Sequence, residues 1–321
     1  MKILVTGGAG FIGSNLIRLL LAEDGGPEVT NLDLLTYAGS LENLREVQDH
    51  PRYTFVRGDI CDGALVGEHM AGTDAVLHLA AESHVDRSIS DPSPFVRTNV
   101  LGTQVLLDQA REAGVSRFLQ VSTDEVYGEL PWVDPEERDA FRPRFTEETP
   151  LNPRSPYSAS KAGGDLLALS YHITFDMDVV VVRGSNNYGP RQHREKLIPL
   201  MTTFAMEGKR LPVYGDGLNV RDWLFVDDFC KGILAALERG RPGEVYNFGG
   251  NAEKTNLQVI GEVLANLGAP HDLVSFVPDR RGHDRRYAID FSKAREKLGW
   301  MPTRRFQEAL AETVRWYRGN A

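Results

Sequence analysis

The chain opens with Lys2-Ile3-Leu4-Val5-Thr6-Gly7-Gly8-Ala9-Gly10-Phe11-Ile12-Gly13, an apolar run that ends in glycines at the spacing of a dinucleotide-binding turn. The apolar run predicts a β-strand, and residues 15–22 predict a helix directly behind the turn. Glycine allows the tight turn and lets backbone N–H groups approach a pyrophosphate. The helix N-terminus adds unpaired N–H donors and the positive end of its dipole. We therefore expect a phosphate-binding turn, with a turn that merely connects strand and helix as the alternative.

A single acidic residue indicates which dinucleotide this turn would hold. Asp33 ends the second expected strand, 20 residues after Gly13. A carboxylate there can accept hydrogen bonds from both ribose hydroxyls, and it would repel a 2′-phosphate. The sequence therefore predicts NAD over NADP.

Apolar runs alternate with helical patterns through the first half of the chain, which predicts a parallel sheet with crossover helices. The expected strands are 2–6, 29–33, 53–56, 75–79, 118–122 and 179–183. After about Gly189 the pattern changes to short elements rich in Gly, Pro and Arg, including strands at 211–214 and 245–248 and a helix near 257–267. We expect an α/β fold with a Rossmann-type doubly wound parallel sheet in an NAD-binding domain at 1–188. A smaller C-terminal α/β region at 189–321 would bind the substrate, with some segments returning to the Rossmann domain.

The polar, Pro-bearing stretch from Leu130 to Pro150 is longer than most connections. A stretch of this length predicts a functional or mobile loop.

Composition limits the partners of the chain. Lys plus Arg total 36 against 45 Asp plus Glu, for a formal charge of −9, which disfavours broad attraction to nucleic acid. We expect no transmembrane segment or export signal, because no apolar run approaches the roughly 20 residues that cross a bilayer. Cys61 and Cys230 lie far apart, which favours a reducing cytoplasm over a disulfide framework. We expect no metal ligands and no membrane partner.

A tyrosine and a lysine at helical spacing are the first candidate catalytic residues. Tyr157-Ser158-Ala159-Ser160-Lys161 opens an expected helix, whose i, i+4 spacing puts Tyr157 and Lys161 on one face. An ammonium there would stabilise tyrosinate, so that the phenol could act as a base near neutral pH. Alone, this spacing is more often that of a surface pair. With the glycine turn upstream and Ser122-Thr123 closing a strand, it resembles the Ser/Thr, Tyr, Lys set of the extended short-chain dehydrogenase/reductase family.

Two carboxylates follow the same strand, in Val121-Ser122-Thr123-Asp124-Glu125-Val126-Tyr127-Gly128. The C-terminal edge of a parallel sheet is where open α/β folds bind ligands, and carboxylates are costly there without a task. Two like charges in a partly desolvated site push their pKa values apart, which suits one acid and one base. A hydrated Asp-Glu pair on a loop is the alternative for this dipeptide alone.

Nearly the whole chain resembles the dTDP-glucose 4,6-dehydratases of that extended family. The specific segments are 33–39, 58–62, 185–190, 195–199, 211–215, 221–223 and Ala80-Ala81-Glu82-Ser83-His84-Val85-Asp86-Arg87-Ser88. Two departures weaken the inferred substrate contacts: Arg281 stands where the family usually has Pro, and Arg191-Gln192-His193 replaces a more aromatic run.

The resemblance implies site residues and roles. Thr123, Asp124, Glu125, Tyr157 and Lys161 would be catalytic, with Asp124 as the acid and Glu125 as the base that expel water after C4 of the hexose is oxidised. NAD would be bound by Gly7, Gly10, Phe11, Ile12, Gly13, Asp33, Leu34, Thr36, Asp59, Ile60, Leu79, Ala80, Ala81, Thr98, Tyr157, Lys161 and Asn187. The substrate, dTDP-glucose or a related nucleoside-diphosphohexose, would be bound by Ser83, Thr123, Asn186, Lys196, Leu197, Pro212, Tyr214, Arg221, Asn256, Arg280 and His283. Arg221 and Arg280 would hold the phosphates, since guanidinium groups suit a pyrophosphate.

Several alternatives stay open. A sugar-nucleotide 4-epimerase or decarboxylase would share the fold, NAD and the Tyr-Lys pair, but it would not need Asp124 with Glu125. A catalytically silent NAD-binding scaffold is a further alternative, because a fold does not fix a function. His84, Asp86 and Arg87 suit a structural cluster as well as direct substrate contact. The resemblance also implies a homodimer through helices at 98–113 and 159–174, whose apolar faces could equally belong to the core.

Overall fold

The computed structural model describes residues 1–133 and 142–320. Residues 134–141 of the predicted loop lie outside the described residues. The two described ends of that loop are tied to one C-terminal segment: the Leu130 N–H donates to the carbonyl of Arg286 at 3.1 Å, and Phe145 forms a parallel bridge with Ile289.

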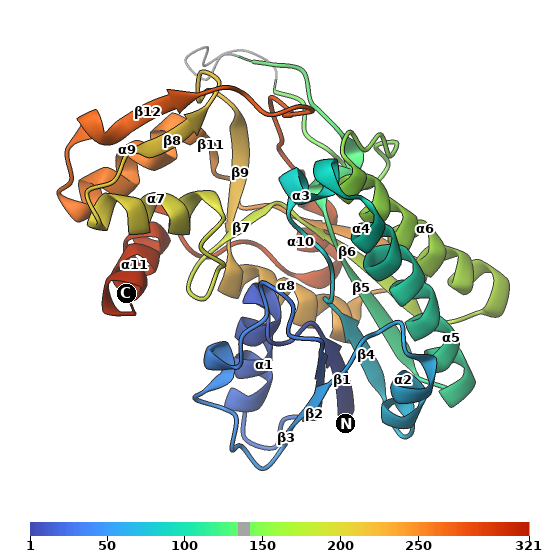
Figure 1. Ribbon diagram of the computed structural model, residues 1–321. Helices are drawn as coiled ribbons and strands as arrows, with labels where there is room; N and C mark the ends of the chain where they lie inside the picture. The colour runs from blue at the N-terminus through green and yellow to red at the C-terminus, as the bar shows by residue number, and fades with distance from the viewer. Residues whose placement is uncertain (134–141, 321) are drawn as a thin grey trace.

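A seven-stranded parallel sheet, in the order β10-β6-β5-β4-β1-β2-β3, forms the centre of the molecule (Figure 1). Its strands are β1 (Lys2–Thr6), β2 (Glu28–Asp33), β3 (Tyr53–Arg57), β4 (Ala75–His78), β5 (Arg117–Thr123), β6 (Val179–Gly184) and β10 (Val245–Phe248). Runs such as Val179–Val182 are buried throughout, as expected for strands covered on both faces. The strand order reverses between β1 and β4, and such a switch point is where open α/β sheets bind ligands. The predicted Rossmann-type fold is confirmed.

Helices cover both faces of the sheet. Along β1, Ile3 and Val5 belong to one apolar cluster and Leu4 to another, because successive side chains point to opposite faces. The first cluster joins α1 (Phe11–Ala22), α8 (Val226–Arg239) and α10 (Ser292–Leu298) to the sheet. The second joins α2 (Gly63–Met70), α5 (Thr103–Ala113) and α6 (Pro156–Phe175). Since α8, β10 and α10 follow residue 189, C-terminal segments complete this layer structure; the proposed boundary between 188 and 189 itself stays a prediction.

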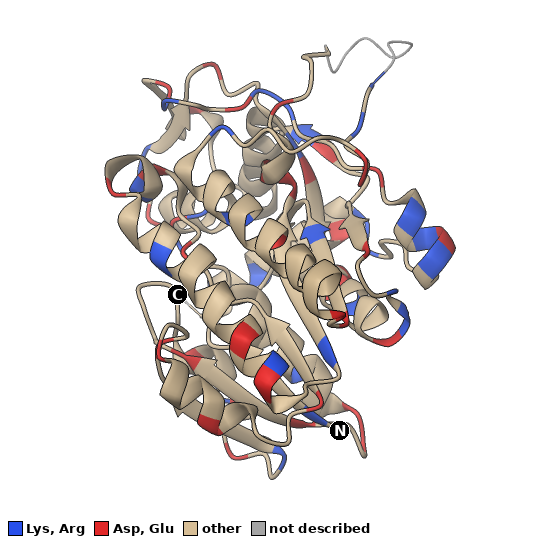
Figure 2. Ribbon diagram, turned by 90° about the vertical axis from the view of Figure 1, so that its right-hand side faces the viewer, with Lys and Arg blue, Asp and Glu red and all other residues tan. Residues whose placement is uncertain are grey.

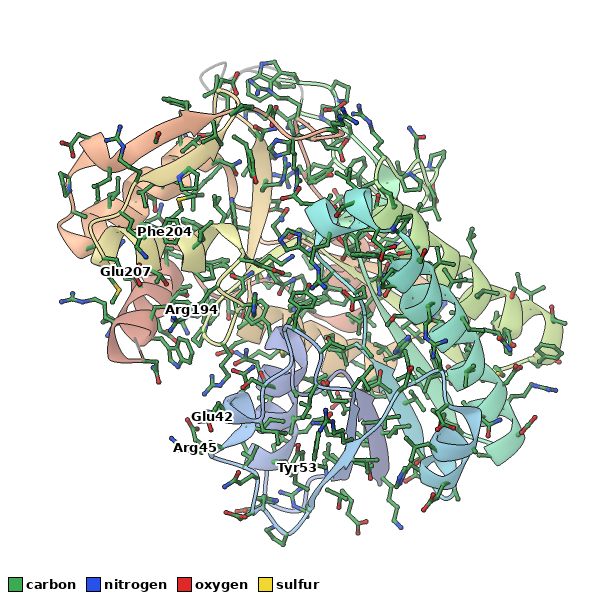
Figure 3. The ribbon with its side chains drawn as sticks, viewed as in Figure 1. Glu42, Arg45, Tyr53, Arg194, Phe204 and Glu207 are labelled. Carbon is green, nitrogen blue, oxygen red and sulfur yellow. The ribbon has the colours of Figure 1, made fainter. Side chains whose placement is uncertain are left out.

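A second region, at the upper left in Figure 1, has its own apolar cluster. It contains a three-stranded sheet of β7 (Asn186–Tyr188), β9 (Val220–Phe225) and β11 (Glu253–Thr255), and a pair of β8 (Leu211–Tyr214) with β12 (Val274–Val277). The helices α7 (Leu197–Met206), α9 (Asn256–Leu267) and α11 (Phe306–Gly319) pack with them. Short elements complete the described chain: η1 (Leu41–Leu44), α3 (Val85–Ser90), α4 (Ser93–Val96), η2 (Arg97–Gly102), η3 (Asp124–Tyr127) and η4 (His271–Leu273). In Figure 3, Arg194 before α7 and Glu42 on η1 lie on the same side of the molecule, where the two regions face each other.

Candidate active site

The glycine turn packs as closely as its sequence predicts. Gly7 has φ +73°, and a Cβ on it would lie 2.6 Å from the backbone of Ala80. A Cβ on Gly13 would lie 2.3 Å from the carbonyl oxygen of Gly7. Helix α1 begins at Phe11, earlier than the expected Asn15, with Gly10 as a cap that has no side chain to accept from the first N–H groups. Those donors are left for an anionic ligand, so the turn suits a pyrophosphate.

Asp33 is held against this turn. Its two carboxylate oxygens accept the N–H groups of Ala9 at 2.9 Å and Leu35 at 2.8 Å. Burial raises the pKa of the Asp33 carboxyl, and these two N–H groups oppose the rise. The side chain is 8% exposed and fixed in position, and it still has free lone pairs for ribose hydroxyls.

A cavity of about 320 Å³ lies at the carboxyl ends of the central strands. Every residue that the sequence assigned to NAD lines it, from Gly7 in the turn to Asn187 on β7. The five expected catalytic residues line the same cavity: Thr123, Asp124, Glu125, Tyr157 and Lys161. The glycine cradle and the uncapped helix start fit the diphosphate of a dinucleotide, with the catalytic side chains further along the same space.

The carboxylate pair begins the short helix η3, directly after β5. The Thr123 hydroxyl accepts the Glu125 N–H at 3.3 Å and donates to Asp124 Oδ1 at 3.3 Å. Asp124 is 1% exposed, and its Oδ2 is buried without a hydrogen-bond partner among the described residues. One carboxylate oxygen is therefore held by the protein, and the other is left for a ligand.

The two carboxyls differ in their electrostatic surroundings. Burial raises the pKa of Asp124 well above its ordinary value, and the charges of Glu125 and Asp222 add to the rise. Burial also raises the pKa of Glu125, but Arg280, Arg221 and Lys196 oppose it. This difference favours a neutral Asp124 beside an ionised Glu125.

Tyr157 and Lys161 both belong to the first turns of α6, and both line the cavity. Burial raises the pKa of Tyr157 well above its ordinary value, as do Glu125 and Asp124, while a hydrogen bond with Thr123 opposes the rise. The Lys161 ammonium donates to the carbonyl of Val121 at 2.7 Å, and burial lowers the pKa of Lys161. That the Lys161 ammonium stabilises the Tyr157 phenolate stays a prediction, and burial and two neighbouring carboxylates act against that phenolate in this structure.

The predicted substrate residues divide into two groups. Ser83, Asn186 and Lys196 line the cavity together with Thr123, whereas Leu197, Pro212, Tyr214, Arg221, Asn256, Arg280 and His283 do not line it. The residues that do not line the cavity belong to the second region and to the segment before α10.

The two arginines expected to hold the phosphates differ in the hydrogen bonds that their guanidinium groups already make within the protein. Arg221 donates to the carbonyls of Val220 at 2.8 Å and Asp284 at 2.9 Å, so two of its nitrogens are already engaged. Arg280 lies 3.5 Å from Asp86, and its Nε is buried without a partner among the described residues. Arg280 is thus the better-placed cation of the two for an incoming anion.

Sequence reasoning gave no separate role to Glu195, which also lines the cavity. Its Oε2 lies 3.4 Å from His84 and 3.5 Å from His193. Its Oε1 lies 3.9 Å from the Lys196 ammonium and is buried without a hydrogen-bond partner among the described residues. The only signal in the sequence was its place beside Lys196.

His84, Asp86 and Arg87 make contacts within the protein. His84 caps α3 by accepting the Arg87 N–H, and the Arg87 guanidinium lies 4.0 Å from the Tyr37 ring centroid. Asp86 lies beside Arg280, so all three residues have the contacts of a structural cluster, and their direct contact with substrate stays a prediction.

In the described ranges 1–133 and 142–320, no three His, Cys, Asp or Glu side chains are grouped as metal ligands. The helices of the same ranges are all too short or too polar to span a bilayer.

Comparisons with known proteins agree over the whole chain. The family model for GDP-mannose 4,6 dehydratase matches residues 4–313. A dTDP-glucose 4,6-dehydratase of Streptomyces griseus is 56% identical over 317 residues, which cover 98% of this chain and 93% of that protein. The structure of DesIV, a dTDP-glucose 4,6-dehydratase of Streptomyces venezuelae with NAD and TYD bound, has a TM-score of 0.95 and 51% identity over 100% of this chain and 98% of that one. A UDP-glucose 4-epimerase of Thermotoga maritima is 32% identical with a TM-score of 0.90, over 100% and 99% of the two chains.

Proposed function

Because the chain belongs to the GDP-mannose 4,6 dehydratase family, we propose that it removes water from dTDP-glucose with the help of NAD, giving dTDP-4-keto-6-deoxyglucose. The observation that carries the proposal is the pair Asp124 and Glu125 in the wall of the cavity that also contains the dinucleotide turn. The reaction makes the chain a hydro-lyase. The names of the S. griseus relative and of DesIV support the same substrate.

The first chemical task is oxidation at C4 of the hexose. Bound NAD would supply a hydride acceptor for C4 and a hydride donor for C6. Tyr157, once ionised, accepts the proton of the C4 hydroxyl, and the Thr123 hydroxyl donates a hydrogen bond to the same oxygen. Lys161 keeps a positive charge beside this reaction from its place on the carbonyl of Val121.

The second task is elimination of water across C5 and C6. The C5 proton becomes acidic because it is α to the new ketone, so the Glu125 carboxylate can remove it. Hydroxide is a poor leaving group, because the pKa of water is about 15.7, so the C6 hydroxyl needs a proton from Asp124. Glu125, which then carries the C5 proton, would give a proton back to C5 once C6 has been reduced.

The substrate would be held from both regions of the molecule. Ser83, Asn186 and Lys196 belong to the cavity wall and are assigned to the sugar end, while Arg280 and Arg221 are assigned to the diphosphate. Thymine is the proposed base because the relatives above are dTDP-glucose enzymes. Uracil is the base named for the epimerase of the same fold, so base choice needs its own test.

A 4-epimerase is the second candidate function, since one such enzyme shares the fold at 32% identity. An epimerase has no use for an acid held protonated next to a charged base. Asp124, with its burial and its unpartnered Oδ2, therefore favours dehydration.

A homodimer belongs to the same proposal. Leu166 and Ile173 on α6 are 58% and 79% exposed, and Leu101, just before α5, is 43% exposed. Figure 2 looks onto the side where these helices lie, and most of their ribbon is uncharged. Burying such side chains against a second copy would be favourable. We also assign the protein to the cytoplasm, which suits the free thiols of Cys61 and Cys230.

Product analysis tests the function. The purified protein is incubated with NAD and, separately, with dTDP-glucose, UDP-glucose and GDP-mannose, and the products are identified by mass and NMR. The proposal predicts loss of one water from dTDP-glucose with a keto group at C4 and a methyl group at C6. Recovery of a C4 epimer of unchanged mass would establish the second candidate instead.

A further inference from the structure

A buried charged pair lies behind the two segments that carry the catalytic residues. Arg183 on β6 and Asp165 on α6 are both buried, and the guanidinium Nε donates to Asp165 Oδ2 at 2.9 Å. Such a pair is weak evidence for stability, because the lost hydration of both charges offsets their attraction. Neither side chain lines the cavity, so any part that they have in the reaction is exerted through the residues that they hold.

The same guanidinium reaches the segment that bears the carboxylate pair. Arg183 Nη1 donates to the hydroxyl of Tyr127 at 2.9 Å. Tyr127 is the last residue of η3, the short helix that begins with Asp124 and Glu125. Arg183 pairs with Ser122 in the register of β6 and β5, one residue before the end of β5 from which η3 starts. Arg183 therefore connects the far end of η3 to the central sheet.

Asp165 belongs to the helix that carries the oxidation residues. Tyr157, Lys161 and Asp165 follow at intervals of four residues on α6, which places them along one side of the helix. Burial lowers the pKa of Lys161, and the charge of Asp165 opposes that fall. Arg183 thus joins the helix that holds the residues for oxidation at C4 to the segment that holds the residues for elimination.

The Tyr127 side chain is held on three sides. Its hydroxyl accepts from Arg183 and donates to Asn247 Oδ1 at 2.9 Å. Burial raises the pKa of Tyr127 although the charge of Arg183 opposes the rise, so the hydroxyl keeps the proton that it donates. The Tyr127 ring stacks on that of Phe145, with the centroids 5.1 Å apart. Since the Thr123 hydroxyl caps the start of η3, this helix of four residues is fixed at both ends.

We infer that Arg183 is a positioning residue, which acts through the Tyr127 hydroxyl to set the carboxylates of η3 at the place on the sugar that elimination needs. This inference rests on the proposed dehydration. Oxidation takes place at C4 and elimination at C5 and C6, so one bound sugar must meet the residues of α6 and those of η3 together. A displacement of about 1 Å in such an arrangement can cost about 10²-fold in rate. The connection to Tyr127 therefore matters for elimination, whereas oxidation depends on residues that α6 holds by itself.

Tyr127→Phe tests this connection with the smallest change. The variant lacks the hydroxyl, keeps the ring on Phe145 and leaves the buried charged pair in place. It also keeps the hydrogen bond from the Asn152 N–H to the carbonyl of Val126 in η3, which is 3.0 Å long. We therefore expect the variant to fold.

Tyr246→Phe is the matched control. Its hydroxyl accepts the Arg241 N–H at 3.1 Å, and its buried ring belongs to the apolar cluster of α1, α8 and α10 on the other face of the sheet. Arg183→Lys is a second test variant. It keeps a charge beside Asp165, but an ammonium lacks the planar fork with which the guanidinium reaches two partners at once.

The absorbance of NADH in a stopped-flow instrument follows both steps in a single turnover of dTDP-glucose, since NADH forms when C4 is oxidised and disappears when C6 is reduced. In Tyr127→Phe, we expect NADH to form at the wild-type rate and to disappear about 10- to 100-fold more slowly. Quenched samples should then contain dTDP-4-ketoglucose, which has lost two hydrogens but no water. Arg183→Lys should show the same selective delay and Tyr246→Phe should not. Thermal melting checks that each variant is folded.

Several results would overturn this role of Arg183. They are a Tyr127→Phe enzyme with both rates unchanged, one in which formation and disappearance of NADH slow by the same factor, and one in which only formation slows. A folded Arg183→Lys enzyme without the delay, or a Tyr246→Phe enzyme with it, would also contradict the inference. If Arg183→Lys is unfolded at the assay temperature, Tyr127→Phe decides alone. Failure of the proposed function would look different, because the wild-type enzyme itself would then form no 4-keto-6-deoxy product.

Discussion

Replacing Asp124 by Asn keeps the size of the side chain and removes the proton that the C6 hydroxyl needs. Asp124 is 1% exposed, and its Oδ2 has no hydrogen-bond partner among the described residues. No second acidic side chain of those residues is therefore hydrogen-bonded to that oxygen. Loss of a positioned acid costs about 10²- to 10⁴-fold in rate, which corresponds to about 3–5 kcal/mol in the activation free energy. We expect kcat for dTDP-glucose to fall by that factor.

A modified substrate shows whether the loss concerns protonation of the leaving group. Fluoride departs without a proton, so the 6-deoxy-6-fluoro analogue of dTDP-glucose should be converted by Asp124→Asn at a rate close to that of the wild-type enzyme. Glu125→Gln is the control: it lacks the base for C5 and should fail with both substrates. Elimination is followed by fluoride release and by the mass of the nucleotide sugar. Near wild-type turnover of dTDP-glucose by Asp124→Asn, or no rescue by the fluoro analogue, would refute the assignment of Asp124 as the acid.

Three further predictions concern pH and the cofactor. The raised pKa of Asp124 keeps this acid neutral, so kcat should fall as the pH rises through that pKa. On the acid side, kcat should fall as Glu125, whose pKa is also raised, gains a proton. A kcat that does not change from pH 5 to 9 would contradict both roles. Gly13→Ala places a Cβ 2.3 Å from the carbonyl oxygen of Gly7 in the same turn. It should lower the free energy of unfolding by about 1–3 kcal/mol and remove most of the affinity for NAD, as measured by thermal melting and by titration. Gly319→Ala is the control and should change neither quantity, because a Cβ on Gly319 has no other atom within 4 Å. Asp33 should make NAD bind more tightly than NADP in calorimetry, and Asp33→Asn should narrow the difference; tighter binding of NADP by the wild-type protein would oppose this role of the carboxylate.

The sequence was sufficient for the parts of the site that depend on local structure. A strand, a glycine turn and a helix must follow one another as Lys2 to Ala22 do, and parallel strands bring their carboxyl ends to one edge. For that reason the residues assigned to NAD, although spread from Gly7 to Asn187, all line one cavity.

Contacts between distant segments were beyond such reasoning. Arg221 donates to the carbonyl of Asp284, 63 residues further along the chain, and no local pattern announces that partner. The same holds for Lys161, whose ammonium is taken by the carbonyl of Val121, and for Glu195 between two histidines. The protonation states of Tyr157 and Asp124 depend on burial, which only the folded chain defines.

The central claim is that a hydride leaves C4 and returns to C6 of the same sugar while Asp124 and Glu125 expel water. It is tested most directly with dTDP-glucose that carries deuterium at C4, in a single incubation followed by NMR of the product. We predict that the deuterium is found in the C6 methyl group of dTDP-4-keto-6-deoxyglucose. Deuterium lost to the solvent, or retained at C4 in an epimerised sugar, would contradict the account.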